Sequence, residues 1–181
     1  MILLFQVAIC PAATAQFSFG TTFHQVMGRQ DSINLAQVEG IVAEYGWLGE
    51  HKIGDEANGT LWLVVQHASL ETQEQYLPVI EASVLRGETP ASKLAFLRDR
   101  IAYNRREKQY YGTQVVQIKE TGKYKPYPIA DPGQVDQRRQ EIGLEPLADY
   151  LDFFGIKEVA LESLDDASVF EYLEHQAGAG H

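Results

Sequence analysis

The feature that most constrains the fold is a change in the spacing of apolar residues at Gly112. Before it, apolar residues recur every three or four positions, which is typical of helices with one buried face. After it they alternate in TQVVQIKETGKYKPYPI, which indicates two strands around the turn Glu120-Thr121-Gly122. The sequence predicts a mainly α (α+β) fold, a single helical domain with one β-hairpin at about 113–129 inserted after the fourth helix.

Four helices are expected before the hairpin. Their starts follow from residues that cap a helix or suit its first turn: Asp31 or Ser32, Asp55, Ser69, and Thr89-Pro90. The second helix ends in LWLVVQHAS, which is apolar nearly all round and is therefore expected at the centre of the core. The fourth helix is expected to run to about Gln109. Residues 16–30 show no clear period and are expected to be a lead-in segment.

Three further helices are expected after the hairpin. The first runs from Asp131-Pro132 to Gly143, and PLADYLDFFG then begins at Pro146. The segment SLDDASVFEYLEHQ reads as a capped amphipathic helix. We therefore expect a helical domain over residues 31–155 and an acidic helical extension over 156–181.

The charge of the chain is negative and unevenly distributed. The net charge of −10 argues against a general nucleic-acid binder, which needs cationic groups to neutralise phosphates. Residues 98–139 hold ten Lys/Arg and five Asp/Glu, whereas residues 140–181 hold one and ten. Two interpretations follow: the acidic end docks on or near the basic segment, or the basic segment meets an anionic ligand.

The N-terminal stretch MILLFQVAICPAATAQ has a secretory pattern. A short apolar run, residues 2–9, precedes Ala13-Thr14-Ala15, which suggests a signal peptide over residues 1–15 and cleavage before Gln16. No Lys or Arg precedes the run, so a buried strand or helix is the alternative. Export would place the protein in the periplasm or outside the cell, would remove Cys10, the only cysteine, and would leave no membrane span; otherwise the protein is cytoplasmic.

Several mechanisms lack their usual signatures in this sequence. GxxxxGK[ST], a GxGxxG after a strand, HExxH and GxSxG are all absent, and the five histidines show no metal-ligand spacing. The sequence therefore predicts no metal and no cofactor.

His67 and Asp99 are the candidate catalytic residues. His67 ends an apolar helix, so it is either a core histidine bonded to a carbonyl or carboxylate, or a general base lining a pocket. Asp99 lies mid-helix and faces small residues, so it is either part of a buried salt bridge to His67, Arg138 or Arg139, or a catalytic carboxylate. A small envelope hydrolase would use His67 as base, oriented by Asp99.

A second group of polar residues surrounds the stretch KQYYGTQ. Gly112 is expected to adopt the left-handed conformation at the helix end. The neighbouring amides and hydroxyls either satisfy the free carbonyls of that helix end or form a polar rim that binds a ligand. An arginine side chain can bind a carboxylate or phosphate through two parallel hydrogen bonds. The alternative for the adjacent Arg138 and Arg139 is a pair that is solvated or forms ion pairs with nearby acidic residues. The candidate ligand-binding residues are Arg100, Gln109, Tyr111, Thr113, Gln114, Arg138 and Arg139.

Four stretches resemble, in order, an uncharacterised family of small bacterial proteins that are often exported: DSINLAQVEGIVAEYGW, IGDEANGTLWLVVQHA, LRDRIAYNRREKQYYGTQ and PIADPGQVDQRRQEIGLEPLADYL. The resemblance covers roughly residues 31–151 and rests on the ordered motifs QHA, DR, QxYGTQ and RRxxxGL. Leu48 stands where the family often has proline. The resemblance raises the expectation of export and implies no reaction.

Three hypotheses for function remain open at this point. The first is an exported helical domain whose polar pocket binds a small-molecule or peptide ligand. The second is the small hydrolase that uses His67 and Asp99. The third is a structural domain in which the polar cluster is a buried network. The sequence does not distinguish an enzyme from a non-catalytic ligand-binding domain.

Overall fold

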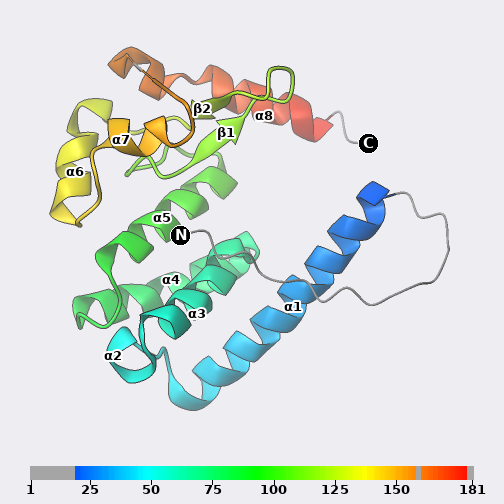
Figure 1. The fold of residues 1–181 in the computed structure, drawn as a ribbon, viewed down its shortest axis with the longest axis vertical. Helices are drawn as coiled ribbons and strands as arrows, with labels where there is room; N and C mark the ends of the chain where they lie inside the picture. Colours follow the sequence, from blue (N-terminus) through cyan, green and yellow to red (C-terminus); the bar gives the residue numbers. More distant parts are fainter. Residues whose placement is uncertain (1–18, 158–159, 179–181) are drawn as a thin grey trace.

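The computed structural model describes residues 19–157 and 160–178, so the predicted signal peptide at 1–15, including Cys10, lies outside the described residues. The chain is mainly helical, with one small hairpin after the first five helices (Figure 1). The elements are α1 (Phe19–Tyr45), α2 (Glu50–Ile53), α3 (Asp55–His67), α4 (Leu70–Leu85), α5 (Ala91–Arg105), β1 (Val115–Gln117), β2 (Tyr124–Pro126), the 3-10 turn η1 (Pro132–Gln134), α6 (Val135–Glu141), α7 (Leu147–Asp152), the 3-10 turn η2 (Leu161–Asp165) and α8 (Ser168–Gly178). This confirms the predicted fold class.

The first core lies among α1, α3, α4 and α5. Val65, Ile80 and Leu97 are fully buried there. The indole of Trp47 donates a hydrogen bond to the Thr89 hydroxyl at 3.2 Å. Thr89 was expected to cap α5, but its hydroxyl is occupied in the core, and Pro90 takes the N-cap position without a side-chain hydrogen bond.

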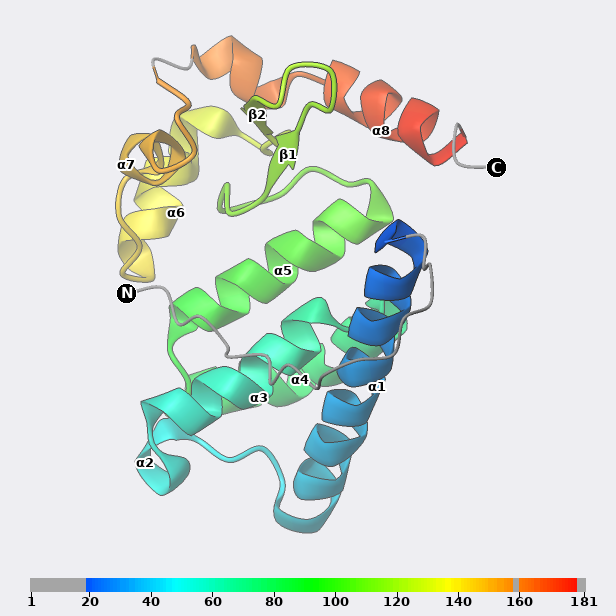
Figure 2. The same ribbon diagram turned by 45° about the vertical axis from the view of Figure 1, so that its right-hand side comes forward.

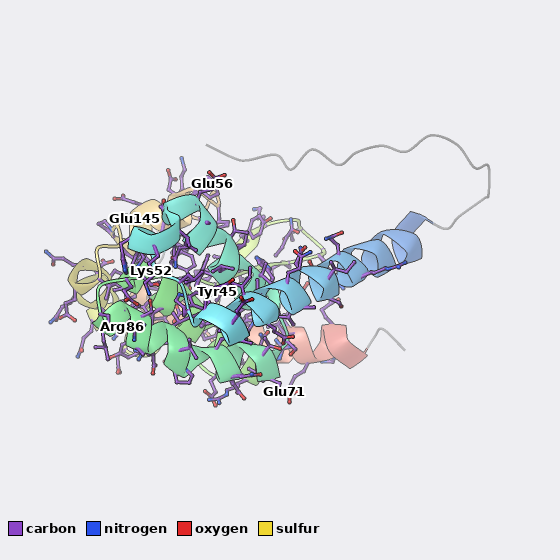
Figure 3. The ribbon with its side chains drawn as sticks, turned by 90° about the horizontal axis from the view of Figure 1, so that it is seen from below. Tyr45, Lys52, Glu56, Glu71, Arg86 and Glu145 are labelled. Atoms are coloured by element: carbon purple, nitrogen blue, oxygen red, sulfur yellow. The ribbon has the colours of Figure 1, made fainter. Side chains whose placement is uncertain are left out.

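The structure corrects the predicted start of the first helix. α1 begins at Phe19 rather than at Asp31, and it includes most of the expected lead-in segment. The Ser32 hydroxyl donates to the carbonyl of Gly28 one turn earlier, so Ser32 lies inside the helix and does not cap it. Figure 3 shows α1 projecting beyond the other helices. The apolar periodicity of a helix arises from the face that it buries against other elements, so a part of a helix that extends beyond those elements shows no such periodicity.

Three further expectations about helices need correction. α5 ends at Arg105 rather than near Gln109, because Arg106 adopts the left-handed conformation with φ 61°. The segment GWLGEHKIG at residues 46–54, whose three glycines predict a loop, contains the short helix α2. In α3, Leu61 and Val65 are buried but Leu63 is 44% exposed, so the second half of this helix is not enclosed on every side.

The hairpin matches its prediction in position and turn. β1 pairs antiparallel with β2, and Val116 lies opposite Lys125. Gly122 has φ 67°, the left-handed conformation that a glycine readily adopts in a tight turn.

The second half of the chain packs over the hairpin and α5. Ile129, Leu147 and Leu151 form one small core, and α8 contributes Val169 to another beside the hairpin. The acidic end docks on the basic segment, since Asp165 forms an ion pair with Lys108. Among the described helices, none has the length and apolar character that a membrane span requires.

Candidate functional site

Asp99 organises the loop that follows α5. Its side chain is fully buried, and its carboxylate accepts hydrogen bonds from the backbone N–H groups of Tyr110 (2.7 Å), Tyr111 (3.1 Å) and Thr113 (3.0 Å). It also accepts a hydrogen bond from the Thr113 hydroxyl at 3.0 Å. Burial raises the pKa of Asp99, and the hydrogen bonds from the loop oppose that effect. The predicted salt-bridge partners of Asp99 were side chains, but its hydrogen-bond partners are this loop.

Arg138 of α6 binds the carbonyl side of the same loop. Its Nε donates to the carbonyl of Tyr110 at 2.9 Å, and one terminal nitrogen donates to the carbonyl of Ala130 at 2.6 Å. The guanidinium also lies 4.1 Å from the centre of the Tyr110 ring, a cation–π contact. Arg138 is therefore held by protein groups on several sides.

Arg139 makes the equivalent contact one residue further along the loop. It is fully buried, and it donates to the carbonyls of Tyr111 and Glu145, each at 2.7 Å. Its third nitrogen has no hydrogen-bond partner and lies 3.6 Å from the Glu145 carboxylate. Burial lowers the pKa of Arg139, because desolvation penalises its charge.

Gln109 and Gln114 complete this network. The Gln109 side-chain oxygen accepts from the backbone N–H of Gln114 at 2.7 Å. Its NH₂ group donates to the carbonyls of Gln114 (3.0 Å) and Tyr127 (2.7 Å). The NH₂ group of Gln114 donates to the Thr113 hydroxyl. We call the side chains of Asp99, Gln109, Arg138 and Arg139, with the backbone of residues 109–114 that they bind, the loop clamp.

Gly112 lies in the middle of the loop clamp and has φ 72°. A Cβ atom there would lie 2.6 Å from Cδ1 of Leu147 and 3.0 Å from Cδ1 of Ile129. The left-handed prediction is confirmed, but its place is corrected: α5 has already ended, and Gly112 reverses the chain inside the loop. Both conformation and packing favour glycine.

His67 does not join the loop clamp. His67 is exposed at the end of α3, so of its two alternatives the buried core histidine is wrong. Its pKa is lowered by partial burial and by the charge of Arg100, while Asp31 raises it. Within residues 19–157 and 160–178, no hydrogen bond joins His67 to Asp99.

Arg100 differs from Arg138 and Arg139, because no carbonyl group of the described residues binds its guanidinium. Its Nε is buried without a hydrogen-bond partner, and no hydrogen bond or ion pair to another described residue holds its guanidinium. The guanidinium lies 5.8 Å from the centre of the Tyr103 ring and interacts electrostatically with Tyr150 and His67. Burial lowers the pKa of Arg100.

Gln66 contacts α5 one turn before Arg100 and was not predicted as a site residue, although it is the first residue of the QHA motif. It is 4% exposed, and its NH₂ group donates to the carbonyl of Phe96, one turn before Arg100, at 3.2 Å. Its side-chain oxygen is buried without a partner. We call His67, Arg100, Tyr103 and Tyr150 the Arg100 surface.

Two cavities lie elsewhere in the molecule. One of about 580 Å³ is lined by residues of α6, α7 and the turns, among them Val135, Leu147 and Leu151. The other, of about 420 Å³, lies between the hairpin and α8. None of the predicted site residues lines either cavity. In the described part of the chain, no cluster of three or more His, Cys, Asp or Glu is arranged to hold a metal ion.

The fold and these contacts define a small helical domain organised by a buried ionic clamp on one face of α5. A model described as "Family of unknown function (DUF6624)" matches residues 17–162, and the chain belongs to this family. The match is longer than the 31–151 of the sequence resemblance and includes the whole of α1. Neither the curated proteins nor the solved structures contain a match.

Proposed function

We propose that this protein is a non-catalytic binding domain, and that Arg100 binds a carboxylate of its ligand. The proposal rests on the guanidinium of Arg100, whose terminal nitrogens make no hydrogen bond or ion pair with a described residue; its Nε is buried and is not offered to a ligand. Other arginines have protein partners: Arg86, Arg98 and Arg105 each pair with a glutamate.

The energetics of a partly buried cation support this assignment. A guanidinium that loses water without gaining an acceptor or an opposite charge is unfavourable. A ligand carboxylate would supply both, through two parallel charge-assisted hydrogen bonds.

The loop clamp has the properties of the predicted structural network. Asp99 is engaged by the loop backbone, and Arg138 and Arg139 are engaged by carbonyls. The hydrolase hypothesis needs Asp99 to orient His67, and no described contact favours that pairing. Of the predicted ligand-binding residues, Arg100 is the one whose geometry best supports contact with a ligand.

The binding test compares two arginines on the same helix. Acetate, benzoate and glutamate are titrated into ¹⁵N-labelled protein at millimolar concentrations, and the Arg Nε–H signals are followed. We expect the Arg100 signal to shift and Arg100→Gln to weaken binding at least about tenfold, the effect of one lost charge-assisted hydrogen bond.

Arg98→Gln is the matched control, because Arg98 is exposed and pairs with Glu81. This variant should bind the carboxylates as the wild type does. Wild-type protein that binds none of the three carboxylates, or Arg100→Gln protein that binds them equally well, would overturn the proposal.

We further propose that the protein is exported and that cleavage before Gln16 removes residues 1–15. The apolar run at 2–9 and the Ala13-Thr14-Ala15 site support this. Expression in a bacterial host, followed by intact-mass measurement of the periplasmic and cytoplasmic fractions, provides the test. Full-length protein confined to the cytoplasm would refute export.

A further inference from the structure

We propose that the face of the hairpin beneath α8 is a docking site for an acidic amphipathic helix of a partner protein, and that α8 is a displaceable internal occupant of this site. This inference does not depend on the carboxylate site, because Arg100 is not part of the apolar cluster that α8 covers. It is carried by the way α8 is attached and by the charges of the two surfaces that meet.

α8 packs against the hairpin and begins after the end of the family match at residue 162. In both ribbon views it lies beside β1 and β2 and away from α2, α3 and α4 (Figures 1 and 2). Val169 packs with Val116 and Tyr127. The Phe170 ring meets the Tyr127 ring edge-on, with ring centres 5.4 Å apart. We call Val116, Ile118 and Tyr127, with the neighbouring Tyr103 of α5, the hairpin face.

The chain is fixed just before α8 begins. Leu164 of η2 is buried in the small core with Ile129, and its carbonyl accepts a hydrogen bond from the Ile129 N–H at 2.7 Å. The next residue, Asp165, forms an ion pair with Lys108. Residues 167 and 168, which lead into α8, are exposed. α8 can therefore leave the hairpin face while η2 keeps its place.

Few buried contacts hold α8. Of its described side chains Val169 alone is buried, whereas α3, α4 and α5 each bury four residues. The hollow of about 420 Å³ between α8 and the hairpin removes further contact. Ordering a helix costs conformational entropy, which burial of apolar area must offset. We therefore expect α8 to open more readily than the helices of the first core.

The hairpin and α8 carry opposite charge. Residues 118–125 hold three lysines and one glutamate, whereas residues 161–176 hold five Asp/Glu and no Lys/Arg. Lys125 lies 3.8 Å from the Asp166 carboxylate, and the Lys119 N–H donates to the Tyr172 hydroxyl at 2.8 Å. The helix that fits this site is therefore amphipathic, with acidic residues at its N-terminal end, where the helix dipole also favours them.

Departure of α8 uncovers an apolar patch bordered by lysines. Val116 and Tyr127 are buried with α8 in place, and they lose their contacts with α8 when it leaves. Lys119 and Lys125 lie at the border of this patch. An apolar centre with a polar rim is typical of protein interfaces. The fit of α8 shows the chemistry of the partner helix that this surface accepts.

The test supplies the helix to the full chain as a separate peptide. A fluorescent peptide with the sequence of residues 163–178 is titrated into wild-type protein and into Val169→Asp protein. The introduced carboxylate cannot stay in the apolar cluster, so it releases α8. We expect the peptide to bind this variant at least about tenfold more tightly than wild type, in which α8 competes at a high effective concentration.

Glu171→Gln is the matched control, because Glu171 is exposed on the same helix. This variant should keep α8 in place and bind the peptide as weakly as the wild type does. Bound peptide should shift the amide NMR signals of the hairpin in Val169→Asp protein and leave those of α3 and α4 unchanged.

Altered peptides test which features of the helix are recognised. A peptide with Val169→Asp should not bind. A peptide with Asp165→Asn and Asp166→Asn should bind severalfold more weakly, because it loses its charge while an asparagine still accepts the hydrogen bond that Asp166 takes from the Ser168 N–H. Equal binding of the asparagine peptide would show that the site does not select an acidic helix.

Hydrogen exchange of wild-type protein tests displacement without any substitution. The amides of α8 should exchange faster than those of α3 and α4. Equal protection of α8 and α3 would show that α8 does not leave its place, and the proposal would fail.

The remaining outcomes also decide the matter. Folded Val169→Asp protein that binds no peptide, or binds it no better than wild type, contradicts a docking site on the hairpin face. Phe170→Ser replaces Val169→Asp if the latter does not fold, and failure of both variants to fold shows that α8 is an integral part of the domain. Light scattering identifies a different occupant: a wild-type dimer that the peptide converts to monomer assigns the face to α8 of a second copy and overturns the partner helix.

Discussion

Replacement of Asp99 by Ala should be among the most destabilising single changes in this domain. The substitution removes the acceptor for three backbone N–H groups and the Thr113 hydroxyl. Each buried donor left unpaired costs about 1–3 kcal/mol. Tyr110 and Tyr111 are not buried residues, so we expect a total loss of about 3–5 kcal/mol, similar to breaking a buried charged interaction.

A loss of this size is large relative to the stability of an ordinary domain, which is about 5–15 kcal/mol. Asp99→Asn keeps one acceptor oxygen but turns an NH₂ group toward donors, so its expected loss is smaller, about 2–3 kcal/mol. Urea unfolding followed by circular dichroism measures both values. Glu107→Gln provides a surface control, because Glu107 is exposed and its contact with Arg105 is 4.0 Å long.

Hydrogen exchange tests the mechanism behind the loss. In Asp99→Asn, the amides of Tyr110, Tyr111 and Thr113 should exchange much faster than those of the α3 and α4 core. If Asp99→Ala lowers the free energy of unfolding by less than about 1 kcal/mol, or leaves these amides protected, the carboxylate does not hold the loop.

Three further predictions follow from the same contacts. Arg139→Lys should lower the free energy of unfolding by about 2–3 kcal/mol, since one ammonium cannot reproduce the fork that binds two carbonyls; unchanged urea unfolding would contradict this. Gly112→Ala should cost about 2–4 kcal/mol, from its left-handed backbone and the 2.6 Å approach to Leu147, and unaltered thermal unfolding would refute it. The pKa of His67, measured by NMR titration, should lie below its ordinary value of 6.5, and Arg100→Gln should raise it. Because this folded-state pKa is lowered, the stability contributed by neutral His67 is present above pH 6.5 and is lost as pH falls through the folded pKa. If Arg100→Gln leaves the His67 pKa unchanged, the charge of Arg100 does not lower it.

The features that the sequence predicted correctly depend on interactions between residues that are close together in the chain. Ser69 caps α4 by accepting a hydrogen bond from the Thr72 N–H. Gly122 adopts the left-handed conformation at the predicted turn. The hairpin follows from alternation around its turn. Each of these signals lies within a few residues of the feature that it specifies.

The errors occur where a distant part of the chain decides the structure. α5 ends just before Arg106, which adopts the left-handed conformation although it is not a glycine, so the sequence gives no sign of this helix end. Asp99 binds backbone N–H groups 11 to 14 residues later in the chain, and backbone partners leave no mark in the sequence. The exposure of His67 depends on how α3 packs against its neighbours, which the apolar period of one helix does not give.

Asp99 and Arg100 are adjacent, yet they contribute to different parts of the molecule. Consecutive helical residues point about 100° apart, so Asp99 faces the loop while the Arg100 guanidinium lies 5.8 Å from the centre of the Tyr103 ring and its charge lowers the pKa of His67. A variant at Asp99 disturbs α5 and the loop together, so loss of ligand in that variant would not identify a binding residue. Arg100 makes no hydrogen bond or ion pair to the described residues and is partly desolvated, so Arg100→Gln should leave the free energy of unfolding equal to or above that of the wild type. If this variant proves strongly destabilised, Arg100 belongs with the loop clamp as a structural residue, and the binding surface must be sought elsewhere.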